Sequence, residues 1–206
     1  MDLYVVGAGQ HGEVVLDIAR ASGRYNVVGF FDSNPAVHGR ELDGVPVLGP
    51  PERVDGPFVV AIGDNAARRR ITEALVKRGL KPITVVHPMA CVSPLAKIGP
   101  GAMICAGAIV CIRTEVGAGV IINTGAVVDH HNRIGDFVHI GPRAVIAGRV
   151  TIGEEVLIGA GATVIPGLTV GARSKVGAGS VVIHDVPPGI TVVGVPGSVI
   201  GQKGSG

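Results

Sequence analysis

Three histidines lie within ten residues of one another and are the side chains of this sequence best suited to chemistry. His130 and His131 are adjacent, and His139 follows shortly after them. A neutral imidazole, with a pKa ordinarily near 6.5, accepts a proton at physiological pH and can act as a general base. Asn123 and Asp129 add an amide and a carboxylate close by. The cluster indicates a functional site, and the alternative is a chance grouping of surface histidines.

These histidines lie in a segment that has Val or Ile at every sixth position from Val92 to Val182. A six-residue period fits neither an α-helix nor an isolated strand, and it marks a repeat fold whose units bury their apolar faces by stacking. Small residues recur four places after each Val or Ile, and Gly is common one place after it, which indicates turns. Three hexads make one coil. The segment therefore predicts a three-sided prism of roughly five coils.

The hexad also places the histidines. With each Val or Ile as place one, the inward residues are those at places one and five. His130, His131 and His139 fall at places three, four and six. They are expected at corners or on the outer surface of the prism, not in its core.

Outward residues at place six predict how the prism assembles. Taking every third hexad gives an apolar wall (Ile109, Val127, Val145, Thr163, Val181), a histidine wall (Met103, Ile121, His139, Leu157, Lys175) and a polar wall (Glu115, Arg133, Thr151, Thr169). Two walls with apolar side chains need a partner, because contiguous apolar surface is seldom left in water. We expect a closed homotrimer with His130 and His139 in the cleft between prisms.

The first 87 residues have a different pattern. Apolar runs at 3–6, 27–31, 58–62 and 83–86 predict strands, and helical patterns follow the first and third runs. The first strand leads into Gly7-Ala8-Gly9-Gln10-His11-Gly12, and the second ends at Asp32. We expect a Rossmann-like α/β domain over 1–87 and the prism with a C-terminal tail over 88–206.

The glycine loop resembles a nucleotide-binding turn. Glycines allow close backbone approach, a helix N-terminus offers N–H groups to phosphate, and an acidic residue some 20 positions on can hold a ribose. Because three or four strands are only half of a dinucleotide fold, a mononucleotide-sized ligand such as a nucleotide sugar fits better. Its diphosphate is expected near 9–12 and its ribose or base near Asp32 and 63–65. A purely structural role of the glycines remains open.

Composition narrows the class of protein. The net charge of +2 is weak and its Lys and Arg are scattered, which argues against nucleic acid. The run 68–70 of three arginines is interpreted as an exposed helix face. Cys91, Cys105 and Cys111 lack metal-ligand spacing, so we expect no metal and reduced thiols in a cytoplasmic protein. Neither a signal peptide nor a membrane partner is expected.

The order of glycine loop, hexapeptide prism and the tail Val193-Gly194-Val195-Pro196-Gly197 resembles the sialic-acid O-acetyltransferase family. This family includes acetyl-CoA-dependent N-acetyltransferases of nucleotide-linked 4-amino sugars. The resemblance covers nearly the whole chain. It implies an α/β Rossmann-like domain followed by a left-handed parallel β-helix that binds acetyl-CoA and trimerises.

The resemblance also implies roles for single residues. It makes His130 the general base, with Asn123, Asp129 and His131 around it, and makes His139 a contact of the acetyl group. Acetyl-CoA contacts fall on Gly148, Ala160 and Ala178. Contacts with the nucleotide-linked amino sugar fall on Gly9, Gln10, His11, Asp32, Ser33, Gly63, Asp64 and Asn65. Acetyl transfer then proceeds by direct attack on the thioester, with no cysteine nucleophile.

One residue departs from the family pattern. In the bacillosamine-type enzymes the residue after the catalytic histidine is acidic, whereas His131 stands there in this chain. Asp129 precedes His130, but alternation along a strand would turn the two side chains to opposite sides. The group that orients His130 is therefore open, and His131 is a proton relay, a substrate contact or a bystander.

Two other functions remain open beside amine acetylation. An O-acetyltransferase would use the same residues on a sugar hydroxyl. A non-catalytic trimeric nucleotide-binding module would keep the glycine loop, although the histidine cluster argues against it. The sequence does not distinguish the nucleotide or the sugar.

Overall fold

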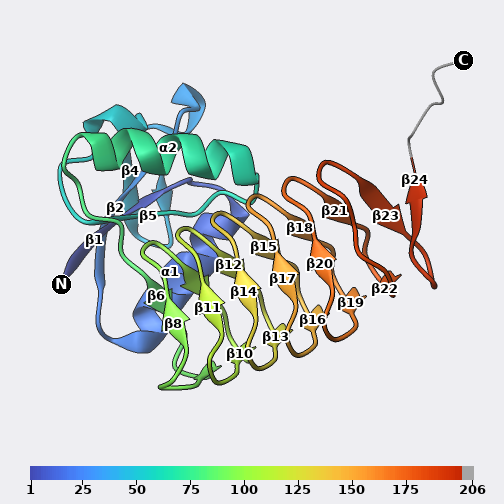
Figure 1. Ribbon diagram of the computed structural model, residues 1–206. Coiled ribbons are helices and arrows are strands. Elements are labelled where there is room, and N and C mark those ends of the chain that lie inside the picture. The colour runs from blue at the N-terminus through green and yellow to red at the C-terminus, as the bar shows by residue number, and fades with distance from the viewer. Residues whose placement is uncertain (201–206) are drawn as a thin grey trace, which may run out of the picture.

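The computed structural model describes residues 1–200, and residues 201–206 at the end of the predicted second domain lie outside that range. An α/β domain packs on the first coils of a three-sided prism that extends away from it (Figure 1). Within 1–200 no helix is both long and apolar enough to cross a membrane.

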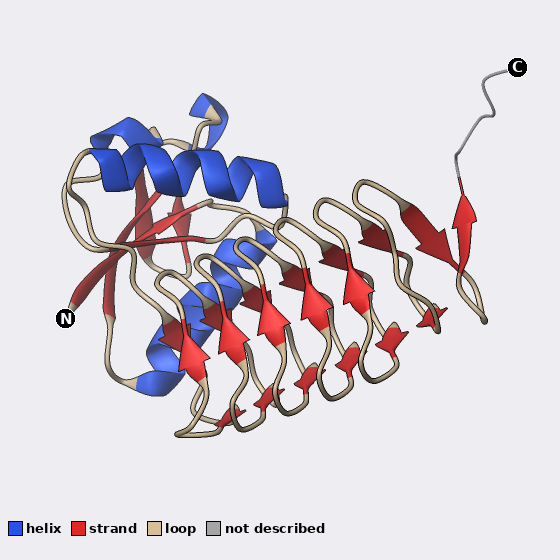
Figure 2. Ribbon diagram, viewed as in Figure 1, coloured by secondary structure: helices blue, strands red, loops and turns tan. Residues whose placement is uncertain are grey.

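The N-terminal domain contains a five-stranded sheet in the order β3-β4-β2-β1-β5. Figure 2 shows its strands together with the helices of the domain. Its strands are parallel except β3, which forms a hairpin with β4. The elements are β1 (Asp2–Val6), α1 (Gln10–Ser22), β2 (Asn26–Phe31), η1 (Pro35–Val37), β3 (Glu41–Leu42), β4 (Val45–Gly49), η2 (Pro51–Arg53), β5 (Phe58–Val60) and α2 (Asn65–Lys77). The first three predicted strands are confirmed. The β3–β4 hairpin is an addition that the apolar runs do not predict.

The prism has three walls of short strands, which are parallel except for the last described strand. The apolar wall contains β7 (Cys91–Val92), β10 (Ile109–Val110), β13 (Val127–Val128), β16 (Val145–Ile146), β19 (Thr163–Val164) and β22 (Val181–Val182). The polar wall contains β8 (Lys97–Ile98), β11 (Glu115–Val116), β14 (Arg133–Ile134), β17 (Thr151–Ile152) and β20 (Thr169–Val170). The histidine wall contains β6 (Val85–Val86), β9 (Met103–Ile104), β12 (Ile121–Ile122), β15 (His139–Ile140), β18 (Leu157–Ile158), β21 (Lys175–Val176), β23 (Thr191–Val193) and β24 (Ser198–Ile200).

Strand register confirms a coil of three hexads. Each strand pairs with the strands three hexads before and after it, as Val127 does with Ile109 and Val145. β6 pairs with β9, so the end of the strand predicted at 83–86 belongs to the prism, whereas Ile83 donates its N–H to the Phe58 carbonyl of the first domain (2.7 Å). The hexad therefore sets the pairing of the whole second half of the chain.

The core of the prism is aliphatic, as predicted. Place-one residues such as Val128 and Ile146, and place-five residues such as Ala126 and Ala144, are fully buried. The left-handed residue of each turn is at place four, not at the glycine-rich place two. Glycine at place two has another cause, because a Cβ on Gly135 would come within 2.7 Å of the backbone nitrogen of Glu154 in the next coil.

The histidine wall is covered by the chain's own N-terminal domain over the first coils. Met103 and Ile121 are fully buried in one cluster with Ile18, Ile83 and Val85. The expectation that this wall turns its apolar residues to a neighbouring chain is therefore wrong for these coils. A hexad pattern defines outward positions but does not reveal which of them another domain covers.

A buried arginine fixes the two domains together. The Arg68 guanidinium is fully buried and donates to the carbonyls of Gly119 (2.7 Å) and Phe137 (2.7 Å) in the prism and of Ile62 (2.8 Å) in its own domain. Burial lowers the pKa of Arg68 to about 10, and nearby carboxylates partly oppose this shift. The prediction of an exposed helix face at 68–70 is wrong for Arg68. Its cation remains protonated at neutral pH and anchors α2 to the prism.

Candidate active site

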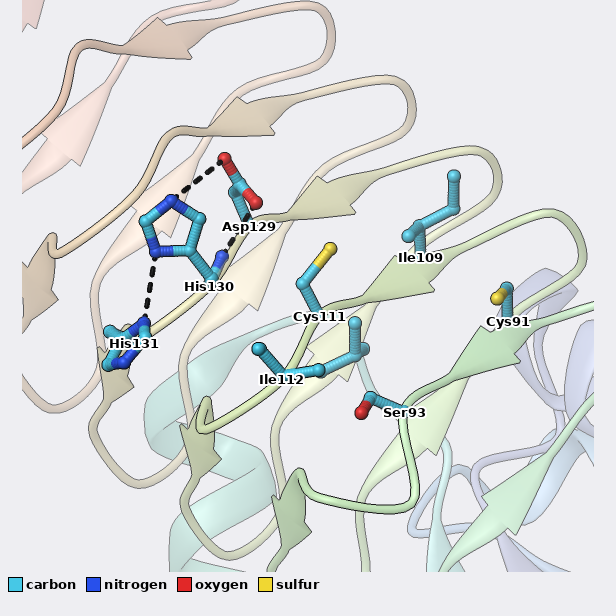
Figure 3. Close-up of a pocket in the computed structure, with 9 residues that line it drawn as sticks. Cys91, Ser93, Ile109, Cys111, Ile112, Asp129, His130 and His131 are labelled. Carbon is cyan, nitrogen blue, oxygen red and sulfur yellow. Dashed lines mark hydrogen bonds and ion pairs between the residues drawn. The ribbon is translucent and has the colours of Figure 1, made fainter.

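His130 lies at the corner between β13 and β14, with polar groups at both sides of its ring (Figure 3). Its Nδ1 lies 3.0 Å from Nδ1 of His131, and its backbone N–H donates to the Asp129 carboxylate (2.7 Å). The other carboxylate oxygen lies 3.9 Å from Nε2, beyond hydrogen-bond length. The side chain is 44% exposed, so the ring remains accessible to a substrate.

Gly148 provides the space that the His130 ring occupies. It stands three hexads later, at the same corner of the next coil, and is buried under the imidazole. A Cβ at this position would lie 2.6 Å from Cε1 and 2.8 Å from Nε2 of His130. Glycine is therefore needed here to seat the ring, a role that sequence reasoning missed.

A pocket of about 540 Å³ adjoins the ring on the apolar wall. It is lined by Asp129, His130 and His131 together with Cys91, Ser93, Ile109, Val110, Cys111 and Ile112. Burial, followed by the Asp129 charge, raises the pKa of the Cys111 thiol, so this sulfur is a poor nucleophile near neutral pH. The histidines, and not the Cys111 thiol, are therefore the reactive side chains of this corner.

His139 lies on the histidine wall and faces the N-terminal domain. Its Nε2 is 3.2 Å from the Asn123 amide nitrogen, and its Nδ1 is 3.3 Å from the Gly63 carbonyl oxygen. Since the amide donates and the carbonyl accepts, the ring carries its proton on Nδ1. Burial and then the Arg68 cation lower the pKa of His139. The ring is therefore neutral and joins the two domains.

His11 lies beside His139, with the two ring centroids 6.3 Å apart. Burial, followed by the charges of His139 and Arg68, lowers the pKa of His11 to about 4. The Nε2 atom of His11 is buried and has no hydrogen-bond partner among residues 1–200. The structure thus brings together His11, Gly63, Asn123 and His139 from both predicted halves of the site.

Some glycines of the loop are required by close packing, and another leaves space for a ligand at the start of α1. A Cβ on Gly7 would lie 2.6 Å from the Ala61 carbonyl oxygen, and one on Gly12 would collide with the Gly7 carbonyl. Gly9 is exposed and has open space where a side chain would be. It caps α1 without a side-chain hydrogen bond, which leaves the first N–H groups of the helix available to a ligand. Gln10 follows it at the surface.

Three residues expected to contact the nucleotide have structural partners. Asp32 accepts hydrogen bonds from the backbone of Ala8 (2.8 Å) and Asn34 (2.8 Å). Asp64 caps α2 by accepting from the N–H of Ala67 (2.8 Å). The Asn65 amide donates to the carbonyls of Glu155 (2.9 Å) and Val156 (3.1 Å) in the prism. Ser33 is exposed and lines a separate pocket of about 140 Å³ with residues of η2 and α2.

The predicted acetyl-CoA residues flank the apolar wall. Ala160 and Ala178 lie one above the other at its corner with the histidine wall, whereas Gly148 and His130 lie at its corner with the polar wall. The wall between them exposes apolar side chains, with Ile109 at 38% and Val145 at 36%. No group of three metal-ligating side chains gathers within residues 1–200.

Two family models match the sequence. The PglD N-terminal domain matches residues 2–75, and the bacterial transferase hexapeptide model of six repeats matches 131–166 and 149–184. A search of curated protein sequences found no match.

Solved structures match almost the whole chain. PerB from Caulobacter crescentus, in complex with CoA and GDP-perosamine, is 38% identical over 98% of each chain, with a TM-score of 0.91. The acetyltransferase domain of PglB from Neisseria gonorrhoeae, in complex with acetyl coenzyme A, is 41% identical over 97% of this chain and 98% of its own (TM-score 0.89). WeeI from Acinetobacter baumannii is 26% identical over 97% of this chain and 100% of its own (TM-score 0.88).

These likenesses extend over both domains and confirm the expected fold class, an α/β Rossmann-like domain followed by a left-handed parallel β-helix. The perosamine N-acetyltransferase of Caulobacter crescentus and the PglB domain are acetyltransferases that match this chain over nearly their full lengths. The chain therefore belongs to the hexapeptide-repeat acetyltransferases with a PglD-type N-terminal domain, within the sialic-acid O-acetyltransferase family.

Proposed function

We propose that this enzyme transfers acetyl from acetyl-CoA to the amino group of a nucleotide-linked amino sugar. The observation that carries the proposal is the accessible imidazole of His130, seated on Gly148 beside a pocket in the apolar wall. The relatives support the substrate classes, because PerB was crystallised with CoA and GDP-perosamine and the PglB domain with acetyl coenzyme A.

In the proposed reaction, His130 is the general base. As the amine attacks the thioester carbonyl, a C–N bond forms and Nε2 of His130 takes the proton of the amine. The C–S bond then breaks, and the CoA sulfur receives that proton as it leaves. A base of this kind contributes roughly 10²–10⁴ in rate, and Gly148, Ala160 and Ala178 line the edges of the wall along which acetyl-CoA binds.

The N-terminal domain binds the nucleotide sugar in this proposal. The open space at Gly9 and the uncapped start of α1 suit a diphosphate, with Gln10 and His11 beside it. In this proposal the ribose or base extends toward Asp32 and Ser33. Gly63, Asp64 and Asn65 shape the same edge of the domain, and the side chains of Asp64 and Asn65 act chiefly through structural contacts.

A homotrimer would join the two halves of the site. Within one chain the contacts of His130 are with Asp129, His131 and Gly148, whereas those of His139 are with Asn123 and Gly63. The apolar wall beside His130 exposes side chains that are seldom left in water. A second copy of the chain, with its own N-terminal domain, would bury them. We place the enzyme in the cytoplasm, since its three cysteines are free thiols.

Purified enzyme tests the proposal with acetyl-CoA and a panel of UDP-, GDP- and dTDP-linked 4-amino sugars. Release of the CoA thiol is followed spectrophotometrically, and mass spectrometry after mild alkaline treatment, which cleaves esters but not amides, assigns the acetylated atom. We expect N-acetylation of at least one panel member. The His130→Ala variant should lose about 100-fold in kcat while light scattering reports an unchanged trimer.

Two outcomes would overturn parts of this proposal. Near-normal turnover by His130→Ala would show that His130 is not the general base. A monomer at micromolar concentration would show that the site is not shared between chains. Thermal shift separates an enzyme from a nucleotide sensor, because only the enzyme is stabilised by CoA. At 100 times Kd a bound ligand adds about 2.7 kcal/mol.

A further inference from the structure

We propose that His131 is a positioning residue that holds the proton of the His130 ring on Nδ1 and so leaves Nε2 free to act as the base. This inference rests on the proposed function, since it concerns the base of that reaction. It assigns a role to the histidine that replaces the family's acidic residue.

The contact between the two rings carries the inference. Their Nδ1 atoms are 3.0 Å apart, and the rings meet edge to face with centroids 5.1 Å apart and planes at 86°. Between two neutral imidazoles one nitrogen must donate and the other accept. When His130 donates, its Nε2 carries the lone pair, and this tautomer is the one that can accept a proton from the amine.

The backbone fixes His131 in this place. Residue 131 has φ 59, in the left-handed region, at the turn position of its coil. Its N–H donates to the Ile112 carbonyl in the coil before (3.0 Å), and the His130 carbonyl accepts from the N–H of Arg149 in the coil after (3.0 Å). The pair is therefore held by both neighbouring coils, with Gly148 supporting the ring from one side.

Asp129 is less suited to the role. One of its oxygens accepts the His130 backbone N–H, and the other is 3.9 Å from Nε2, too far for a hydrogen bond. The pocket beside the pair also contains the thiols of Cys91 and Cys111, and Arg113 and Arg149 stand at the equivalent turns of the adjacent coils. Neither arginine can accept a proton from an imidazole, whereas Nδ1 of His131 lies within hydrogen-bond distance of Nδ1 of His130, and we assign it the acceptor role.

The proton path stays balanced. The amine proton moves to Nε2 of His130 as the C–N bond forms, and it passes to the CoA sulfur as the C–S bond breaks. The Nδ1–H of His130 remains hydrogen-bonded to His131 throughout, which stabilises the transient imidazolium. His131 thus gains and loses no proton over the cycle.

Two substitutions at 131 suit the left-handed backbone because the chain already uses them at this turn place. Gly161 has φ 66 and Glu155 has φ 56 at the equivalent positions. His131→Gly removes the acceptor without adding strain. His131→Glu supplies a carboxylate that can accept the same Nδ1–H. Arg113→Gly is the matched control. It introduces glycine at the same turn place and corner one coil earlier, and so measures the effect of a more flexible backbone alone.

The test is steady-state kinetics over pH 5.5–9 with the active substrate pair. We expect His131→Gly to lower kcat at least tenfold with the KM for acetyl-CoA within threefold of wild type, and Arg113→Gly to keep wild-type kcat. His131→Glu should recover kcat to within threefold. It should also move the acid limb of the pH profile of kcat/KM upward, because a carboxylate stabilises the imidazolium. A purely structural role would not move that limb.

A readout without substrate keeps the two proposals apart. In ¹⁵N-labelled enzyme, long-range proton–nitrogen correlation should show the Nδ1–H tautomer of His130 in wild type and in His131→Glu, with the Nε2–H tautomer rising in His131→Gly. An unchanged tautomer and an unchanged kcat in His131→Gly overturn this inference. If His130→Ala also keeps its activity, the general-base proposal itself fails.

Discussion

Gly148→Ala should disable the enzyme by displacing the ring of His130, the proposed base. The added methyl would lie 2.6 Å from Cε1 and 2.8 Å from Nε2 of His130. Carbon atoms in contact are separated by about 3.5–4.0 Å, so the ring edge must retreat by about 1 Å. The backbone itself accepts alanine, because residue 148 is not left-handed and Ala160 and Ala178 occupy the same hexad place in other coils.

A misplacement of about 1 Å costs about 100-fold in rate, which corresponds to about 2.7 kcal/mol of transition-state stabilisation. The loss should fall on kcat, measured at saturating acetyl-CoA by CoA release. If Gly148 acted only by contacting the cofactor, the KM for acetyl-CoA would rise instead.

The double variant His130→Ala/Gly148→Ala is the matched control. With the ring gone, the methyl has no clash, so the double variant should be no slower than His130→Ala alone. A wild-type kcat in Gly148→Ala, alongside an inactive His130→Ala, would refute this account of the corner.

Two further predictions concern the joint between the domains. Arg68→Met should lower the free energy of unfolding by about 3 kcal/mol or more, because the carbonyls of Gly119 and Phe137 lose their buried donor; urea unfolding at fixed protein concentration measures this, and a change under about 1 kcal/mol would contradict it. The pKa of His11 is lowered to about 4 in the folded state, so the unfolded chain takes up its proton first as pH falls. Relative to His11→Gln, wild type should lose up to about 3 kcal/mol of free energy of unfolding between pH 6.5 and 4. If the free energies of unfolding of the two proteins change in parallel with pH, the burial of His11 has no such effect.

The prism could be predicted residue by residue because each hexad place has one environment. Val128 is inward and Val127 outward for the same reason in every coil, so a fixed period settles core, walls and register together. The coil length also contains a signal for the site that sequence reasoning missed. A separation of three hexads places Gly148 directly beside His130, and a glycine at that distance from a candidate base indicates space kept for its ring.

The joint between the domains could not be predicted in the same way. Arg68 is buried by carbonyls 51 and 69 residues away, and nothing local distinguishes it from its exposed neighbour Arg70. Met103 and Ile121 look like interface residues in the repeat, yet their cover comes from a domain with no periodicity. Such contacts depend on how two separately folded surfaces meet.

The anchored joint has a consequence for how substrates enter. Arg68, Asn65 and the ion pair between Arg69 and Glu154 (2.7 Å) tie the N-terminal domain to the prism through contacts within the chain itself. A hinge that is already locked loses no interdomain freedom when a substrate arrives, so little binding energy is spent on ordering the protein. Capture of either substrate should then be limited by diffusion and desolvation rather than by a closing motion.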